Sequence, residues 1–216
     1  EGLGRMRDPL SVPLLLAAAA RLNGADRFLE HILLYALIEI GDAAAVRKGL
    51  AAAGEPGALT RACLMVLEQI PDSRLEHTEV LPHLHAGPSD LRDTAQWITR
   101  RHPDWAVELG HDLRTRLRRP GITADERARC EALFPMLAAA PLGRAGISSF
   151  IMEPDFAPSS RRAALDAIAG AGWKDIPVSL PMVVARGLAL PEDAAAADPA
   201  VLSILASAVR AAQTLP

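Results

Sequence analysis

The chain has 216 residues, of which 50% are hydrophobic and 23% charged, a composition that suits a folded protein with a core and argues against global disorder. Its formal net charge of −3 gives no overall attraction for nucleic acid or acidic membranes, so such a partner would need a local basic surface. The longest apolar run near the start, residues 12–20, is shorter than the roughly 20 residues that a membrane-spanning helix needs.

The arrangement of apolar residues predicts an all-α protein. Ala and Leu dominate segments separated by Pro, Gly and Asp, aromatic residues make up only 4%, and alternation of β-branched with polar residues is rare. In chain order, we expect helices near residues 9–22, 26–40, 42–53, 56–70, 78–85, 89–102, 104–119, 124–140, 144–153, 159–171, 177–189 and 199–214.

Several of these boundaries have chemical reasons. Gly41 can adopt the left-handed conformation that ends a helix, and Asp42 can cap the next one. Thr123 and Glu126 have the spacing of a capping box. Prolines tolerated in a first helical turn are Pro56, Pro103, Pro177 and Pro199.

Four helical segments align with one another, beginning at Leu59, Leu91, Ser160 and Leu202. The small residues four positions on are Cys63, Ala95, Ala164 and Ala206, and the apolar residues three further on are Val66, Ile98, Ala167 and Val209. This phase predicts one buried face per helix, with small side chains that allow a neighbouring helix to approach closely. The competing interpretation is that any helical protein rich in Ala and Leu aligns with itself in this way.

The expected first helices of successive hairpins begin near residues 26, 57, 90, 124, 160 and 199, a spacing in the thirties that is typical of helical-hairpin repeats. We therefore predict a right-handed α-solenoid of about five to six HEAT-like hairpins. It would form a single domain over residues 1–216, with a capping helix in 1–25 and an irregular stretch at 141–158. Because the chain starts at Glu1 and shows no leader, we expect a piece of a longer polypeptide.

Two stretches resemble a known family. DRFLEHILLYALIEIGD at residues 26–42, followed by LRDTAQWITRRHPDW at 91–105, is similar to the HEAT-like helical segment of large planctomycete-type haem-binding proteins. In that family a dehydrogenase-like propeller, a HEAT-like array and a CxxCH cytochrome module share one exported chain. The likeness covers residues 26–110 well and the remainder loosely.

The resemblance implies an extracytoplasmic (periplasmic) parent protein active in electron transfer or in handling sugars, with dehydrogenase-like and cytochrome domains outside this chain. The CxxCH motif is missing here, and Cys63 and Cys130, the only cysteines, fall in separate helical segments. We therefore expect no cofactor and no metal in this chain, and two free buried thiols.

The first candidate surface is a stripe spaced four residues apart in the helix at 26–40, formed by Arg27, His31, Tyr35 and Glu39. Glu30 lies beside it. The structural interpretation is that these residues form the solvent-exposed edge of a mostly buried helix. The functional interpretation is a docking surface with Tyr35, the only tyrosine, as its anchor.

The second candidate surface lies at residues 100–119, a segment that contains six arginines and only three acidic residues. Arg100, Arg101, Arg114 and Arg118 could bind phosphates or an acidic partner. A helical-repeat nucleic-acid-binding protein of the DNA glycosylase type is the alternative, although the acidic net charge and the lack of a carboxylate–aromatic pocket disfavour it.

Two further groups favour structural roles. The cluster His77, Glu79, His83 and His85 lacks metalloenzyme spacing, and Pro82 disturbs its backbone, so we expect solvated loop histidines. Packing roles are expected for Trp97, Trp105 and Trp173. With no phosphate loop or nucleophile motif present, we predict a non-catalytic interaction scaffold, or a rigid spacer, that contacts protein or flanking domains of the same chain.

Overall fold

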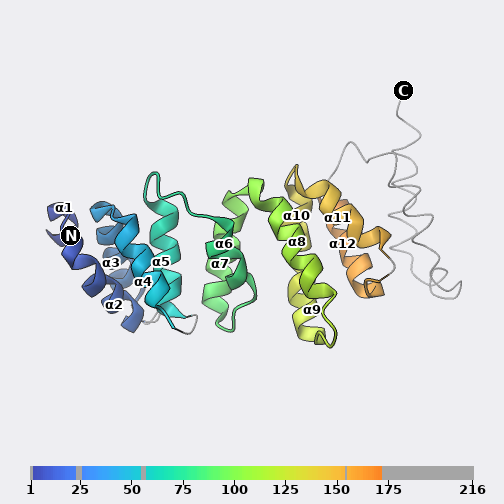
Figure 1. Cartoon of the computed structure of the whole chain (residues 1–216), viewed down its shortest axis with the longest axis horizontal. Coiled ribbons are helices and arrows are strands. Elements are labelled where there is room, and N and C mark those ends of the chain that lie inside the picture. Colours follow the sequence, from blue (N-terminus) through green and yellow to red (C-terminus); the bar gives the residue numbers. More distant parts are fainter. Residues whose placement is uncertain (1, 23–25, 55–56, 154, 172–216) are drawn as a thin grey trace, which may run out of the picture. The chain divides into compact units, whose positions relative to one another are not determined.

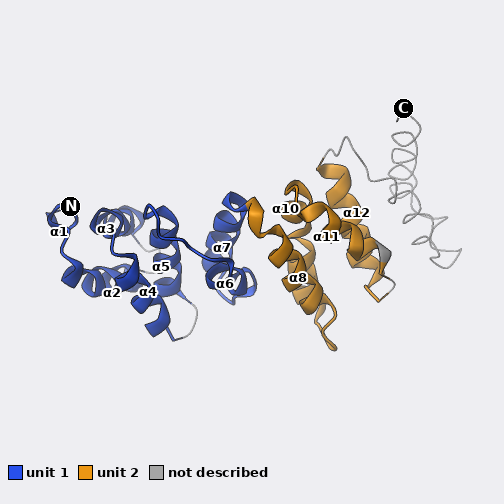
Figure 2. Cartoon of the chain, turned by 45° about the horizontal axis from the view of Figure 1, so that its top comes forward, with its two compact units in different colours: residues 1–102 blue, residues 103–216 orange. Residues whose placement is uncertain are grey.

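The computed structural model describes residues 2–22, 26–54, 57–153 and 155–171. Within these ranges the secondary structure is helical and no strand occurs, which confirms the prediction of an all-α protein. The chain divides into two compact units, residues 1–102 and 103–216 (Figure 2).

Unit 1 is built from short helices that lie side by side (Figure 1). Helix α2 packs on α3 and α4 packs on α5, while α3 also contacts α5 and α5 contacts α7. Central helices of this unit therefore pack both on a chain neighbour and on the helix two places along. The helices are α1 (Gly2–Met6), α2 (Val12–Leu22), α3 (Arg27–Ile40), α4 (Ala43–Ala52), α5 (Ala58–Gln69), α6 (His77–Val80) and α7 (Ser89–Arg101), with 3-10 turns η1 (Pro9–Ser11) and η2 (Leu81–His85).

The aligned helical segments bury the residues that their common phase selects. Cys63, Ala95 and Ala164 are fully buried, and the apolar residues three positions further on are buried as well. The predicted buried face is thus confirmed for these three segments. Ala206 and Val209 of the fourth lie outside the described residues.

The junction of α3 and α4 follows the predicted caps. Gly41 has a φ of 75°, in the left-handed region where a side chain would be strained. The Asp42 carboxylate accepts a hydrogen bond from the Ala45 amide at 2.9 Å. Both boundary predictions are confirmed.

Two expected helices of unit 1 begin or continue differently, and one short helix was not expected. The segment 9–22 starts as η1, capped by Asp8, before α2 begins, and the short helix α1 was not predicted. The segment 78–85 is the single turn α6 followed by η2, because Pro82 in the first turn of η2 supplies no amide for a continuing α-helix.

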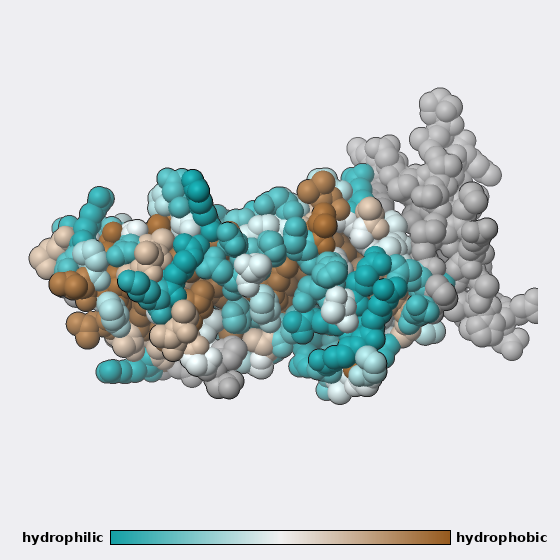
Figure 3. Space-filling view, viewed as in Figure 1, coloured by the Kyte–Doolittle hydropathy of each residue, from teal (hydrophilic) through white to brown (hydrophobic). Residues whose placement is uncertain are grey.

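Apolar surface is visible over the N-terminal helices of unit 1 (Figure 3), where Met6, Leu10 and Leu14 are exposed.

In unit 2, α10 packs both on its chain neighbour α11 and on α12, two places along, while α8 contacts α11, three places along. In its core the ring centres of Phe134 and Phe150 lie 4.8 Å apart, and those of Phe150 and Phe156 lie 5.0 Å apart. The elements are η3 (Pro103–Trp105), α8 (Ala106–Leu117), α9 (Ala124–Glu131), α10 (Phe134–Ala139), α11 (Gly143–Met152) and α12 (Pro158–Gly170).

The expected single helix at 124–140 is wrong, since α9 and α10 are separated by a break. Pro135 lies in the first turn of α10, where it has no amide to continue the hydrogen bonds of α9. The start of α9 agrees with prediction, because Thr123 and Glu126 form both hydrogen bonds of a capping box.

The stretch 141–158, expected to be irregular around a helix at 144–153, holds α11 followed by a loop, in agreement with that helix. Gly143 passes so close to the Leu137 carbonyl that a side chain there would collide with it. Pro103 begins the 3-10 turn η3 and not an α-helix. The helices expected at 177–189 and 199–214 lie outside the described residues, as do Pro56, Pro177, Pro199 and Trp173.

Candidate functional site

A cleft in unit 1 brings together residues from three helices. Its volume is about 770 Å³, within the range of ligand-binding clefts. Helices α3 and α5 contribute their first two turns, and α7 its beginning. This α3–α5–α7 cleft is lined by Arg27, Glu30, His31, Leu34, Gly57, Ala58, Arg61, Met65, Pro88, Ser89 and Asp90.

The cleft lies where these helices begin. Asp26 caps α3 by accepting a hydrogen bond from the Leu29 amide at 2.9 Å. Neither Gly57 at the start of α5 nor Pro88 at the start of α7 provides a side-chain cap. The first amides of a helix carry partial positive charge, so the start of each helix adds a positive potential at this edge of unit 1.

A buried ion pair joins α3 to α5 beside the cleft. The guanidinium of Arg61 donates to the carboxylate of Glu30, and their side chains are 19% and 9% exposed, respectively. Burial of a carboxylate is tolerated only when a partner compensates its charge. The pair therefore ties the two helices together and neutralises the cleft's most buried charge.

The predicted stripe on α3 is divided by the structure. Arg27 and His31 line the cleft and are exposed, whereas Tyr35 and Glu39 do not line it. Tyr35 is 50% exposed. Glu39 lies against Gly4 of α1, and its Oε2 atom is buried with no hydrogen-bond partner among the described residues.

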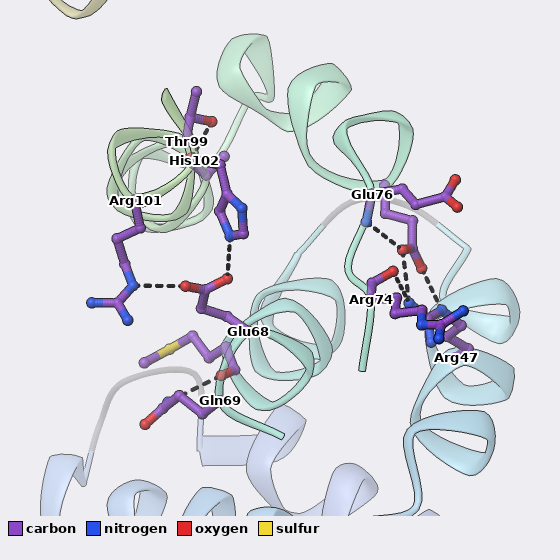
Figure 4. Close-up of polar contacts among 11 residues, drawn as sticks. Arg47, Glu68, Gln69, Arg74, Glu76, Thr99, Arg101 and His102 are labelled. Atoms are coloured by element: carbon purple, nitrogen blue, oxygen red, sulfur yellow. Dashed lines mark hydrogen bonds and ion pairs between the residues drawn. The ribbon is translucent and has the colours of Figure 1, made fainter. Parts of the chain in front are cut away.

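The arginines at the end of α7 are partly used within unit 1. Arg101 donates to Glu68 of α5 at 2.7 Å, and His102 contacts the other oxygen of the same carboxylate at 2.8 Å (Figure 4). The guanidinium of Arg101 also lies 5.1 Å from the centre of the Trp97 ring. Arg100 is exposed and donates to Gln96 at 3.3 Å.

The arginines of α8 serve a similar purpose in unit 2. Arg114 and Arg118 both donate to the carboxylate of Glu153, which follows α11. They also lie over the rings of Phe150 and Phe156, at 5.7 Å and 5.3 Å from the ring centres. Three of the four arginines of the predicted basic surface thus bind a carboxylate of their own unit.

The histidine cluster forms no metal site. Glu79 is held by Arg47 of α4 through two hydrogen bonds of 2.8 Å and 3.0 Å, and it also accepts from the Glu76 amide (Figure 4). Burial lowers the pKa of His83, because the charged ring is poorly solvated in its partly buried environment. In the described residues no group of His, Cys, Asp or Glu side chains is arranged to hold a metal ion.

Cys63 and Cys130 are buried thiols outside any disulfide, as expected. Burial raises the pKa of Cys63 to about 12 and that of Cys130 to about 11. Trp105 is buried at 7% exposure, consistent with a packing role, whereas Trp97 is 39% exposed and departs from that expectation.

Sequence reasoning missed Arg61, the residue that completes the cleft. A sequence signal for such pairs is the number of residues that separates two opposite charges. Three ion pairs that link alternate helices have similar separations: 31 residues for Glu30 and Arg61, 32 for Arg47 and Glu79, and 33 for Glu68 and Arg101. The Arg118 and Glu153 pair in unit 2 is 35 apart. Such separations equal the predicted repeat spacing.

No family profile, curated protein or solved structure matches this chain. Every helix among the described residues is too short or too polar to cross a bilayer.

Proposed function

We propose that this chain is a non-catalytic protein-interaction scaffold, built as a right-handed α-solenoid of about five to six HEAT-like hairpins. The observation that carries this proposal is the series of three ion pairs between alternate helices of unit 1, at separations of 31 to 33 residues, together with a pair 35 residues apart in unit 2. An array of stacked hairpins places equivalent positions of successive repeats next to one another, so a charge in one repeat meets its partner one repeat later.

The use of polar groups also favours a scaffold over an enzyme. Glu68, Glu79 and Glu153 each bind arginine side chains of neighbouring helices, so their charges hold the structure together. The α3–α5–α7 cleft then supplies the concave polar surface that a partner would occupy.

The nucleic-acid alternative is supported less well. It requires guanidinium groups directed at phosphates, but Arg101, Arg114 and Arg118 are engaged by carboxylates of the chain. The parent context, an extracytoplasmic multidomain haem protein, stays a prediction from the resemblance of residues 26–42 and 91–105.

Site-specific photocross-linking in cells of the source organism tests the scaffold function. A benzoylphenylalanine placed at His31 or at Tyr35, both exposed on α3, should yield discrete protein adducts. The same group at Lys48, exposed on α4, is the control. Adducts that are absent, or identical at all three positions, would contradict the interaction function and favour a rigid spacer.

A further inference from the structure

We propose that two copies of this chain associate through the outer face of α2, with each α2 packed antiparallel on the α2 of the other copy about a two-fold axis. This interaction goes beyond the scaffold function and does not depend on it. Three features of α2 support it: its uncovered apolar face, the spacing of the residues on that face, and the fit of that face to a reversed copy of itself.

Helix α2 is apolar on all sides, but unit 1 covers only one of them. The helix packs on α3, α4 and α5, and its buried residues are Val12, Leu15, Leu16 and Ala19. On the opposite face Leu14 is 73% exposed, and Leu10 in the preceding turn η1 is 84% exposed. Arg21, in the last turn, is the only charged residue of α2. A helix that is apolar on all sides is normally buried on all sides, so the exposed face of α2 indicates a further contact.

The residues of the exposed face are spaced for packing against another helix. They follow one another in steps of four, three and four positions, and all of them are exposed: Leu10, Leu14, Ala17 and Arg21. Alternating steps of three and four define the a and d positions of a coiled coil, which form a narrow, straight seam along one helix. Such a seam fits one further helix, whose own side chains enter the gaps between these residues.

This seam is complementary to a reversed copy of itself. Its first half carries the large residues Leu10 and Leu14, and its second half carries Ala17 and Arg21. In an antiparallel pair, Leu14 of one copy lies opposite Ala17 of the other, so that a large side chain fills the space beside a small one. Leu10 then lies opposite Arg21, whose aliphatic stem covers it while the guanidinium stays in water. A parallel pair would instead place the two Arg21 side chains opposite each other.

The exposed area predicts a weak dimer. Leu10, Leu14 and the neighbouring Met6 of α1, which is 68% exposed, present on the order of 400 Å² of surface, the size of an apolar patch that marks an interaction site. Stable complexes bury about 800 Å² on each partner. The antiparallel pair should therefore form with a dissociation constant on the order of 10 μM.

Sedimentation equilibrium of the full chain at concentrations from about 1 to about 200 μM tests this association. We expect the average mass to rise with concentration from the 23.0 kDa of one chain towards twice that value. Leu14→Glu should weaken the dimer at least about tenfold, because it places two carboxylates in an apolar contact near the two-fold axis. The variant should keep its helical circular dichroism, since Leu14 is exposed. Leu142→Glu, at a leucine of unit 2 that is 58% exposed, is the matched control and should associate as the unaltered chain does.

Disulfide cross-linking tests the antiparallel arrangement. Because Cys63 and Cys130 are buried, a cysteine introduced at an exposed position supplies the accessible thiol. An equimolar mixture of Leu14→Cys and Ala17→Cys chains, one of them carrying an affinity tag, should form the mixed disulfide about tenfold faster than Leu14→Cys does with Lys48→Cys. Lys48 is exposed on α4, away from the α2 seam.

Several results would overturn this inference. They are a mass that stays at that of one chain at every concentration, a dimer that Leu14→Glu leaves unchanged or that Leu142→Glu also removes, and mixed disulfides that form no faster at Ala17 than at Lys48. A chain that stays monomeric but sediments with vesicles of phosphatidylcholine and phosphatidylglycerol, and loses this binding in Leu14→Glu, would assign the face to a lipid surface and would also overturn the inference.

Discussion

The Glu30–Arg61 pair offers a quantitative test of how unit 1 is held together. Replacing Arg61 by Met leaves the Glu30 carboxylate without its partner, while only 9% of the Glu30 side chain is exposed. Removing one member of a buried pair costs about 3–5 kcal/mol. We expect about 3 kcal/mol, at the lower end, because the Arg61 side chain is 19% exposed and water reaches the pair in part.

The matched double variant Glu30→Leu/Arg61→Met removes both charges and should lie within about 1 kcal/mol of the unaltered protein, since apolar replacement of a buried pair is often neutral. Glu30→Leu alone should cost about 1 kcal/mol, because the Arg61 head group can turn toward solvent. The coupling energy of the cycle would then be about 3–4 kcal/mol in magnitude. Arg116→Gln, which breaks the more exposed i,i+4 pair with Asp112, should cost about 0.3–0.5 kcal/mol.

Urea denaturation followed by circular dichroism at the helical band measures these free energies of unfolding. The measurement requires the same denaturant slope for all variants, so that a change of midpoint reports stability. A cost below about 1 kcal/mol for Arg61→Met, together with a coupling energy near zero, would refute a buried tie between α3 and α5.

Three further outcomes follow from the structure. Cys63 and Cys130, with pKa values raised by burial to about 12 and about 11, should both resist Ellman's reagent in the native chain and react in guanidinium; rapid reaction of either native thiol would contradict their burial. Because burial lowers the pKa of His83 in the folded state, the contribution of this residue to stability should be complete above about pH 6.5. It should fall as the pH drops from there toward the folded pKa, since the unfolded chain then binds one more proton. His83→Gln should reduce this dependence of the free energy of unfolding on pH, measured by urea titration, and an unchanged dependence would argue against it. Thr123→Ala should lower the stability of unit 2 by about 1 kcal/mol through loss of the α9 capping box, whereas Thr123→Ser, which keeps the hydroxyl, should be tolerated. Equal melting temperatures of the two variants would show that the cap contributes nothing.

Local signals predicted local structure well. Gly41, Asp42 and Thr123 act within a few residues of themselves, so their sequence context determines the boundary. The phase of Cys63 and Ala95 predicted the buried face because helical periodicity needs no knowledge of the neighbouring helix. Where two local signals conflicted, as at Pro135 inside an Ala-rich run, the apolar pattern concealed the break between α9 and α10.

The cleft required information that one helix does not contain. Arg27 and His31 could be placed on one face of α3 from their spacing, but their approach to Arg61 depends on how α3 packs against α5. The exposed guanidinium groups expected at Arg114 and Arg118 are tied to Glu153 for the same reason. Opposite charges separated by the predicted repeat length carry this tertiary information, and they can be sought only once a repeat length has been proposed from the sequence.

Methyl–methyl nuclear Overhauser effects in a sample labelled at Ala, Ile, Leu and Val methyl groups test the central claim most directly, namely that alternate helices pack on one another. We expect cross-peaks that join α3 to α5 and α5 to α7 in unit 1, and α10 to α12 in unit 2, beside those between chain neighbours. Cross-peaks confined to neighbouring helices in the chain, without these alternate pairs, would contradict the stacked-hairpin architecture and the scaffold function inferred from it.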